Sequence, residues 1–321
     1  MKIRGRFAPT PSGPLHLGNA WSALLAWLQV RQAGGEMLLR IEDIDGPRSR
    51  QAYIESIPED LRWLGLDWDE GPDLGGPYSP YRQSERLARY EELLHVLKAK
   101  GLVYPCYCSR AELAAIASAP HGLAAEGPAY PGICRTLSEP ERATRAERKT
   151  PSWRFVMPAE PVAFEDLAMG PQSFPAGYGG DFIVKRADGI YAYQLAVVAD
   201  DADMAVTHVL RGSDLLDSTP RQLALFDALG LPAPRYAHVP LLYGPDGQRL
   251  AKRHGSASIG AMRQSGISPE TIVGWLGYLA GCLPKPEPAK PRDLLPYFRL
   301  DAVPPGPIRL EPAMLDRLGI R

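Results

Sequence analysis

The stretch RFAPTPSGPLHLGN, residues 6–19, combines the end of a strand, a proline-rich turn and the start of a helix. Residues 3–8 predict a short strand, and the prolines that follow form a rigid, extended turn that excludes a helix. Beyond the prolines, apolar residues recur at helical spacing, so a helix with one buried face comes next. We therefore expect His16, Gly18 and Asn19 at the point where a strand leads into a helix N-terminus.

The N-terminus of such a helix favours a phosphate group, because backbone N–H groups and the helix dipole converge there. Gly18 allows a ligand to approach the backbone closely. His16 and Asn19 can donate hydrogen bonds to oxygens on which negative charge builds up. For an isolated H-x-G-x motif, an ordinary strand–helix turn with a surface histidine is the simpler interpretation, so the rest of the chain has to decide.

Residues 9–19, Pro-Thr-Pro-Ser-Gly-Pro-Leu-His-Leu-Gly-Asn, resemble the first signature of class I aminoacyl-tRNA synthetases, in the glutamyl/glutaminyl branch. The resemblance implies catalytic roles for His16 and Asn19, and ATP binding by His16 and Gly18. The family usually carries histidine where this chain has Asn19, which is a neutral donor and supplies no titratable group.

The acidic run Glu42-Asp-Ile-Asp45 follows a strand predicted over residues 37–41. Carboxylates at the carboxyl edge of a parallel sheet suit a ligand site, although a solvated acidic turn explains the pattern equally well. The run resembles the glutamyl-synthetase version of this strand, which implies that Glu42 pairs with the ammonium group of the substrate.

Arg211 ends a second buried strand, predicted over residues 205–212. An arginine there is either a clamp for a substrate carboxylate or a structural partner for Asp200 or Asp201. In the glutamyl family the matching arginine and tyrosine bind the substrate, which implies these roles for Arg211 and Tyr193. The resemblance assigns glutamate binding to Arg6, Ala8, Thr10, Glu42, Tyr193 and Arg211.

The run Arg249-Leu-Ala-Lys252-Arg253 follows a strand predicted over residues 236–243 and resembles the family's second signature, a lysine loop. A lysine there can neutralise the charge that develops on the triphosphate as pyrophosphate leaves. Arg249 and Ala251 replace a lysine and a serine of the family, so we transfer the catalytic and ATP-binding role to Lys252 alone. A basic loop after a hairpin is ordinarily only solvated. The position of this loop directly after the strand at residues 236–243 is what favours a function.

Three of the four cysteines, Cys106, Cys108 and Cys134, lie within 29 residues. Three thiolates from two tight turns can supply three ligands of a tetrahedral zinc site, and their clustering suits a metal in a reducing compartment better than disulfides. Three buried free cysteines are the alternative interpretation. For the fourth ligand His121 is chemically the easier choice, whereas the phenol of Tyr130 has to be deprotonated by the metal.

A subfamily of the glutamyl branch couples glutamate to the modified base queuosine in tRNA(Asp), and its zinc ligands follow the pattern Cys-x-Cys and then Tyr-x-x-x-Cys. The segment from Cys106 to Cys134 resembles this pattern, which favours Tyr130 over His121. We therefore expect one structural Zn²⁺ ion held by Cys106, Cys108, Tyr130 and Cys134.

Size and composition exclude several classes of protein. The 321 residues are 45% hydrophobic and 23% charged, as in a globular protein with a proper core. No apolar run is long enough for a membrane span, and the N-terminus lacks the apolar core of a signal peptide. A net charge of −1 argues against non-specific nucleic-acid binding but allows a local basic face. We expect a cytoplasmic enzyme that is monomeric and independent of membranes.

Taken together, these resemblances imply an α/β protein with the Rossmann-like, doubly wound parallel sheet of class I synthetases, a zinc-binding insertion and a small helical C-terminal part. Residues 1–102 and 176–245 would form the two halves of the catalytic domain. Residues 103–175 would form the insertion, and residues 246–321 would contain the lysine loop and the helical part, without an anticodon-binding domain.

The resemblance implies that ATP, with Mg²⁺, and L-glutamate form glutamyl-adenylate, which a nucleic-acid hydroxyl then attacks. Thirty residues follow the proline-rich run at 284–291, whereas independent domains start near roughly 50 residues. A core of the glutamyl family that ends here resembles the subfamily that modifies queuosine, which implies that the acceptor is queuosine in the anticodon loop of tRNA(Asp). Two alternatives are a shortened glutamyl-tRNA synthetase, which charges the tRNA 3′ end, and a non-catalytic regulator that binds an adenylate.

Overall fold

A six-stranded sheet organises the chain in the computed structural model, which describes residues 2–109, 112, 122–123, 127–128, 130–250 and 257–320. The strand order is β2-β1-β10-β11-β7-β8; neighbours from β2 to β7 are parallel and β8 is antiparallel. The predicted doubly wound parallel sheet is confirmed, with an antiparallel edge strand added. The bounds are β1 Arg4–Phe7, β2 Glu36–Leu39, β7 Val162–Asp166, β8 Gly170–Phe174, β10 His208–Gly212 and β11 Arg235–Val239.

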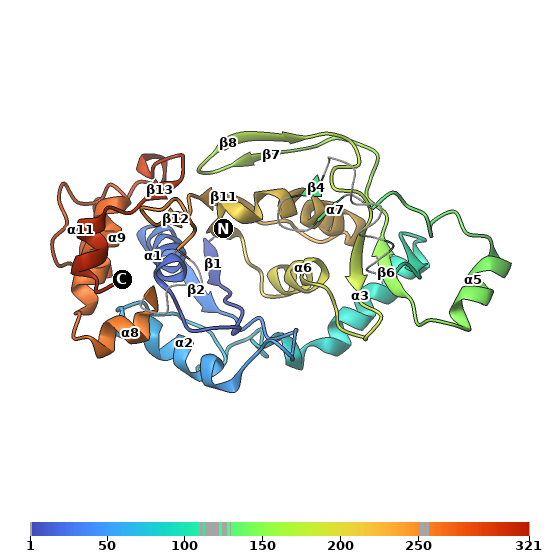
Figure 1. Ribbon diagram of the computed structural model, residues 1–321, viewed down its shortest axis with the longest axis horizontal. Helices are drawn as coiled ribbons and strands as arrows, with labels where there is room; N and C mark the ends of the chain where they lie inside the picture. The colour runs from blue at the N-terminus through green and yellow to red at the C-terminus, as the bar shows by residue number, and fades with distance from the viewer. Residues whose placement is uncertain are drawn as a thin grey trace.

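Side chains alternate between the two faces of the parallel strands, as their period of two requires. Leu39 and Leu210 belong to the core that α1 (Leu17–Gln32) covers. Their neighbours Leu38 and Val209 lie in a separate core on the opposite face. In Figure 1, α1 lies on one side of the sheet, and α6 (Tyr193–Asp203) and α7 (Thr219–Leu229) lie on the other.

Helix α1 packs closely against β1, because apolar residues cover most of its circumference. A Cβ atom added to Gly5 of β1 would lie 2.4 Å from Val30 Cγ2, so this crossing requires glycine. The extended turn between β1 and α1 is held by backbone hydrogen bonds from Glu42 to Pro9 and from Arg50 to Pro11. The N-terminus of α1 is thereby fixed beside the carboxyl end of β1.

A second sheet, β3-β6-β9, is antiparallel and carries the cysteines at the end of β3. Helix α3 packs beside it, and α5 extends away at one end of the molecule (Figure 1). The β7–β8 hairpin lies within the range expected for the insertion, yet it extends the main sheet through the pair Tyr236–Asp166. The bounds are α3 Leu87–Ala99, β3 Val103–Cys106, α5 Glu139–Ala146, β6 Ser152–Phe155 and β9 Phe182–Lys185.

The predicted helical C-terminal part is confirmed, and it packs into the core that α1 covers. Its helices are α8 Ile259–Gln264, α9 Pro269–Leu279, α10 Pro291–Leu294 and α11 Pro312–Arg317, with β13 Ile308–Arg309 paired to β12 Leu242–Tyr243. The remaining elements are α2 Gln51–Trp63, β4 Gly122–Leu123, β5 Gly127–Pro128 and the short 3₁₀ turns Gln83–Glu85, Ser213–Ser218 and Leu300–Ala302. Within the described part of the chain, every helix is too short or too polar to cross a membrane.

Candidate active site and cysteine cluster

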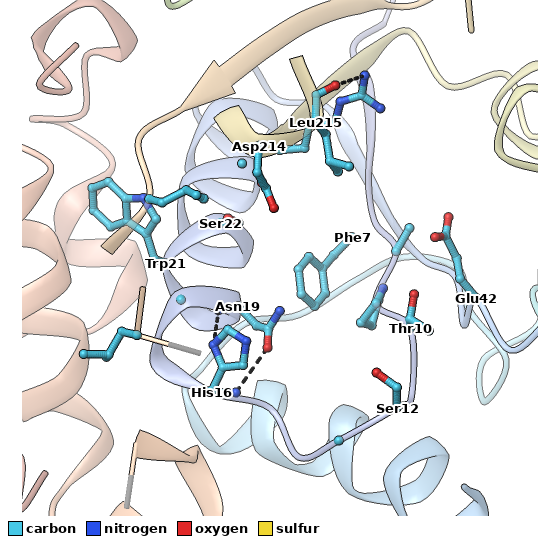
Figure 2. A pocket seen from close by; sticks show the side chains of 18 of the residues that line it. Phe7, Thr10, Ser12, His16, Asn19, Trp21, Ser22, Glu42, Asp214 and Leu215 are labelled. Atoms are coloured by element: carbon cyan, nitrogen blue, oxygen red, sulfur yellow. Dashed lines mark hydrogen bonds between the residues drawn. The ribbon is translucent and has the colours of Figure 1, made fainter. Parts of the chain in front are cut away.

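A cavity of about 810 Å³ opens at the carboxyl ends of β1, β2 and β10, where a doubly wound sheet binds its ligands (Figure 2). All the predicted catalytic, glutamate-binding and ATP-binding residues that the structure describes line this cavity. They are Arg6, Ala8, Thr10, His16, Gly18, Asn19, Glu42, Tyr193 and Arg211. Lys252 and Ala251 lie outside the described residues.

His16 and Asn19 form a reciprocal cap at the start of α1. The backbone N–H of Asn19 donates to His16 Nδ1 at 3.3 Å, and that of His16 donates to Asn19 Oδ1 at 3.3 Å (Figure 2). A neutral His16 ring then carries its proton on Nε2. The amide nitrogen of Asn19 has no hydrogen bond to any described residue, so it remains a donor for a ligand.

The cavity-lining carboxylate of Glu42 is paired with a buried guanidinium, that of Arg40. Arg40, fully buried below Glu42, pairs with Asp201 at 2.8 Å and with Glu42 at 3.1 Å. Burial raises the pKa of Glu42, although Arg40 and Arg6 oppose this. No local pattern indicates this role of Arg40, because its partner Asp201 is far away in the chain.

Arg211 makes four hydrogen bonds, all to uncharged acceptors. Nε donates to His238 Nε2 at 3.0 Å, Nη1 to Gln222 Oε1 at 2.8 Å, and Nη2 to Thr219 Oγ1 at 2.8 Å and to the Leu215 carbonyl at 3.3 Å. Four of its five N–H groups are therefore occupied, and one on Nη1 has no partner among the described residues.

No carboxylate within the described part of the chain lies within 4.0 Å of Arg211, because Asp200 and Asp201 pair with Arg40 and Arg86. A buried cation is costly without an opposite charge. The geometry therefore favours a carboxylate ligand over a structural partner. The hydroxyl of Tyr193, the first residue of α6, also has no hydrogen bond to a described residue and lines the cavity.

Several lining residues were not predicted from the sequence. Arg50 and Tyr53 reach the cavity from the start of α2, and Ser12 comes from the proline turn. Asp214 forms an ion pair of 2.9 Å with Arg249, which replaces the first lysine of the second signature. Arg50 and Tyr53 follow the end of the acidic run by five and eight residues, and this proximity is a weak signal that could have indicated them.

The three predicted cysteines come together. The sulfurs of Cys106, Cys108 and Cys134 all lie within 4.8 Å of one another. Tyr130 Oη lies 3.5 Å from Cys106 Sγ and 3.4 Å from Cys108 Sγ, and it accepts a hydrogen bond of 2.9 Å from the Cys134 backbone. Three sulfurs and one oxygen this close together fit a metal that takes thiolate ligands. His121 lies outside the described residues.

Arg154 supports the cysteine cluster from the second sheet. Its Nε donates to Cys106 Sγ at 3.3 Å, and its guanidinium lies 3.9 Å from the centre of the Tyr130 ring. Burial raises the pKa of Cys106, but hydrogen bonds from Tyr130, Cys108 and Arg154 outweigh it and lower the pKa. Burial raises the pKa of Cys108 to about 11. A positive charge at this position offsets the negative charge of a thiolate set.

Comparison with known proteins gives a consistent result. The family model of class I tRNA synthetases (E and Q), catalytic domain, matches residues 2–285. A glutamyl-Q tRNA(Asp) synthetase of Symbiobacterium thermophilum is 63% identical over 95% of both chains, and one of Nitratidesulfovibrio vulgaris is 51% identical over 98% of both. A glutamate–tRNA ligase of Heliobacterium modesticaldum is 47% identical over 95% of this chain and 62% of its own. The crystal structure of a glutamate-tRNA synthetase from Elizabethkingia anophelis superposes with a TM-score of 0.86 at 29% identity, covering 99% of this chain and 70% of that one.

Proposed function

This chain belongs to the class I family of glutamyl- and glutaminyl-tRNA synthetases, and we propose that it activates L-glutamate with ATP and transfers it to queuosine in the anticodon loop of tRNA(Asp). One observation carries the choice of acceptor: the two glutamyl-Q tRNA(Asp) synthetases are 63% and 51% identical to it over nearly their whole length. The glutamate–tRNA ligase is 47% identical.

Glutamate binds at the end of the cavity that β1, β2 and β10 form. Arg211 offers its remaining N–H and its unbalanced charge to a carboxylate, and Tyr193 offers a hydroxyl. Glu42 pairs with the ammonium group, and Arg40 holds the Glu42 side chain in place. Because these groups sit on separate strands and a helix, the sheet fixes their distances before the substrate arrives.

In the first step a glutamate carboxylate oxygen bonds to the α-phosphorus of ATP, and the bond to pyrophosphate breaks. The N–H groups at the start of α1, with His16 and the Asn19 amide, stabilise the charge on the phosphate oxygens. Lys252, from the lysine loop, neutralises the departing pyrophosphate, and Mg²⁺ enters with ATP. No side chain forms a covalent bond.

In the second step a hydroxyl of the queuosine cyclopentenediol attacks the carbonyl carbon of glutamyl-adenylate. A carbon–oxygen ester bond forms, the bond to the phosphate of AMP breaks, and the hydroxyl proton is released. Positioning of the two reactants, without a protein nucleophile, provides most of the rate.

One Zn²⁺ ion would be held by Cys106, Cys108, Cys134 and Tyr130, which together offer three sulfur ligands and one oxygen ligand. Such a closed site stabilises structure and does not bind substrate. With ligands at Cys106 and Cys134, the metal would link the end of β3 to the segment that precedes α5.

Pyrophosphate exchange tests the activation step. With the protein alone, labelled pyrophosphate should enter ATP when L-glutamate is present, and it should not when glutamine or aspartate replaces glutamate. Exchange that requires tRNA would favour the ordinary glutamyl-tRNA synthetase. Absence of exchange under every condition would favour the adenylate-binding regulator and contradict the proposal.

A further inference from the structure

A buried chain of hydrogen bonds connects Arg211 of β10 to His238 of β11 and Asp166 of β7. Asp166, the last residue of β7, contacts His238 of β11, and His238 contacts Arg211 at the end of β10. His238 and Asp166 are each only 1% exposed, and neither lines the cavity. They therefore act on a ligand only through Arg211.

The hydrogen bonds fix which nitrogen of His238 carries the proton. Asp166 Oδ2 lies 2.6 Å from His238 Nδ1, and Arg211 Nε donates to His238 Nε2 at 3.0 Å. A ring that accepts from an arginine at Nε2 has to carry its proton on Nδ1, where a carboxylate accepts it. Burial and the charge of Arg211 lower the pKa of His238, although Asp166 opposes this, so the ring stays neutral at neutral pH.

Asp166 is itself held in one orientation. Its Oδ1 accepts backbone hydrogen bonds from His238 at 3.1 Å, Ala168 at 3.0 Å and Met169 at 2.9 Å. Only Oδ2 faces the histidine ring. The β7–β8 hairpin, which joins the parallel sheet at Asp166, thus supplies a rigid acceptor for the chain of hydrogen bonds.

We infer that Asp166 and His238 are positioning residues for glutamate: they orient the Arg211 guanidinium so that its one unoccupied N–H faces the substrate carboxylate. This inference rests on the proposed function of Arg211. Because four of the five N–H groups are already occupied, a rotation of the guanidinium would turn the remaining one away from the cavity.

The substitution Asp166→Asn tests the tautomer. The three backbone donors keep an oxygen at the Oδ1 position, so the new amide NH₂ faces His238 Nδ1. The ring then has to carry its proton on Nε2, where it meets the N–H of Arg211. We expect the KM for glutamate in pyrophosphate exchange to rise about tenfold to a hundredfold, the range for a hydrogen bond to a charged group, with a smaller change in kcat. Glu165→Gln makes the same chemical change at the exposed neighbouring position and should leave KM unchanged.

A pair of substitutions at His238 separates positioning from folding. His238→Gln can place an oxygen near the former Nε2 and still accept from Arg211, whereas His238→Asn can reach only Asp166. We expect the glutamine variant to keep a KM for glutamate within about fivefold of the wild type and the asparagine variant to lose at least about tenfold. Equal KM values for the two variants, or a KM for Asp166→Asn within about twofold of the wild type, would overturn the inference.

The tautomer can also be read in the wild-type protein without any substrate. Nitrogen-15 NMR of the histidine rings should show His238 protonated on Nδ1 only, and His238→Gln identifies its signal. A proton on Nε2 would overturn the inference. If the wild type gives no exchange but the Nδ1 tautomer is present, the proposed function has failed while the hydrogen-bonded chain stands.

Discussion

The cysteine cluster and the cavity are assembled from very different spans of the chain. All four cluster residues lie between positions 106 and 134, whereas the cavity combines residues from Arg6 to Ser258. A short span allows the spacing of ligands to be read directly from the sequence. Groups that meet only through strand order, such as Asp166 and His238, leave no such local pattern.

The two regions also carry opposite unbalanced charges: the cysteine cluster is anionic when its thiols ionise, and the cavity contains the cation Arg211. The cluster collects groups that become anionic around a metal, and it places Arg154 3.3 Å from Cys106. The cavity keeps the buried cation Arg211 among neutral acceptors and leaves one N–H unoccupied. A bound metal ion can therefore balance the negative charge of the cluster, whereas only an anionic ligand can balance the positive charge of Arg211 in the cavity. Substitutions in one region should consequently leave the other unchanged.

Arg211→Lys should give the largest effect. Lysine keeps the charge but loses the planar fork that binds His238, Gln222 and Thr219 together. We expect the KM for glutamate to rise by at least about tenfold, equivalent to about 1.5–3 kcal/mol, with an unchanged zinc content. An unchanged KM would remove Arg211 from the glutamate site, and a loss of zinc would break the separation of the two regions.

Tyr130→Phe should affect the other region alone. The protein should contain about one zinc per chain. Because loss of an outer-shell partner already costs about tenfold or more in affinity, removal of a ligand should weaken metal retention by at least about tenfold, measured by competition with a chromophoric chelator. The KM for glutamate should not change. His121→Ala serves as the control and should retain the metal. If the histidine variant loses zinc and the phenylalanine variant keeps it, the fourth ligand is His121.

Asn19→Ala should give the smallest effect. It removes the hydrogen bond that the His16 backbone N–H donates to the Asn19 side chain at the start of α1, and it removes one donor to the ATP phosphate. We expect a lower Tm together with a severalfold lower kcat in exchange. Ser268→Ala removes the cap of α9, which does not line the cavity, and should lower Tm without lowering kcat. Equal loss of kcat in both variants would indicate that Asn19 acts only through stability.

The parts of the fold that follow from local periodicity and motifs could be predicted from the sequence. The proline turn, the helix after Leu17 and the cysteine spacing are of this kind, and the structure confirms them. Asp166 and His238 could not be predicted, because 72 residues separate them and each reads alone as an ordinary polar residue. The spacing of Val162 and Phe164 fits one face of a strand, but nothing local shows that the strand joins the main sheet. The roles of the individual cavity residues stay predictions.

The identity of the acceptor is the most direct test of the proposed function. Labelled glutamate should be transferred by the purified protein to queuosine-containing tRNA(Asp), and transfer should persist after the terminal adenosine of the tRNA has been removed. tRNA(Asp) with guanine in place of queuosine should accept no glutamate. Loss of transfer on removal of the terminal adenosine, or preferential charging of tRNA(Glu), would contradict the assignment of the anticodon loop as the acceptor.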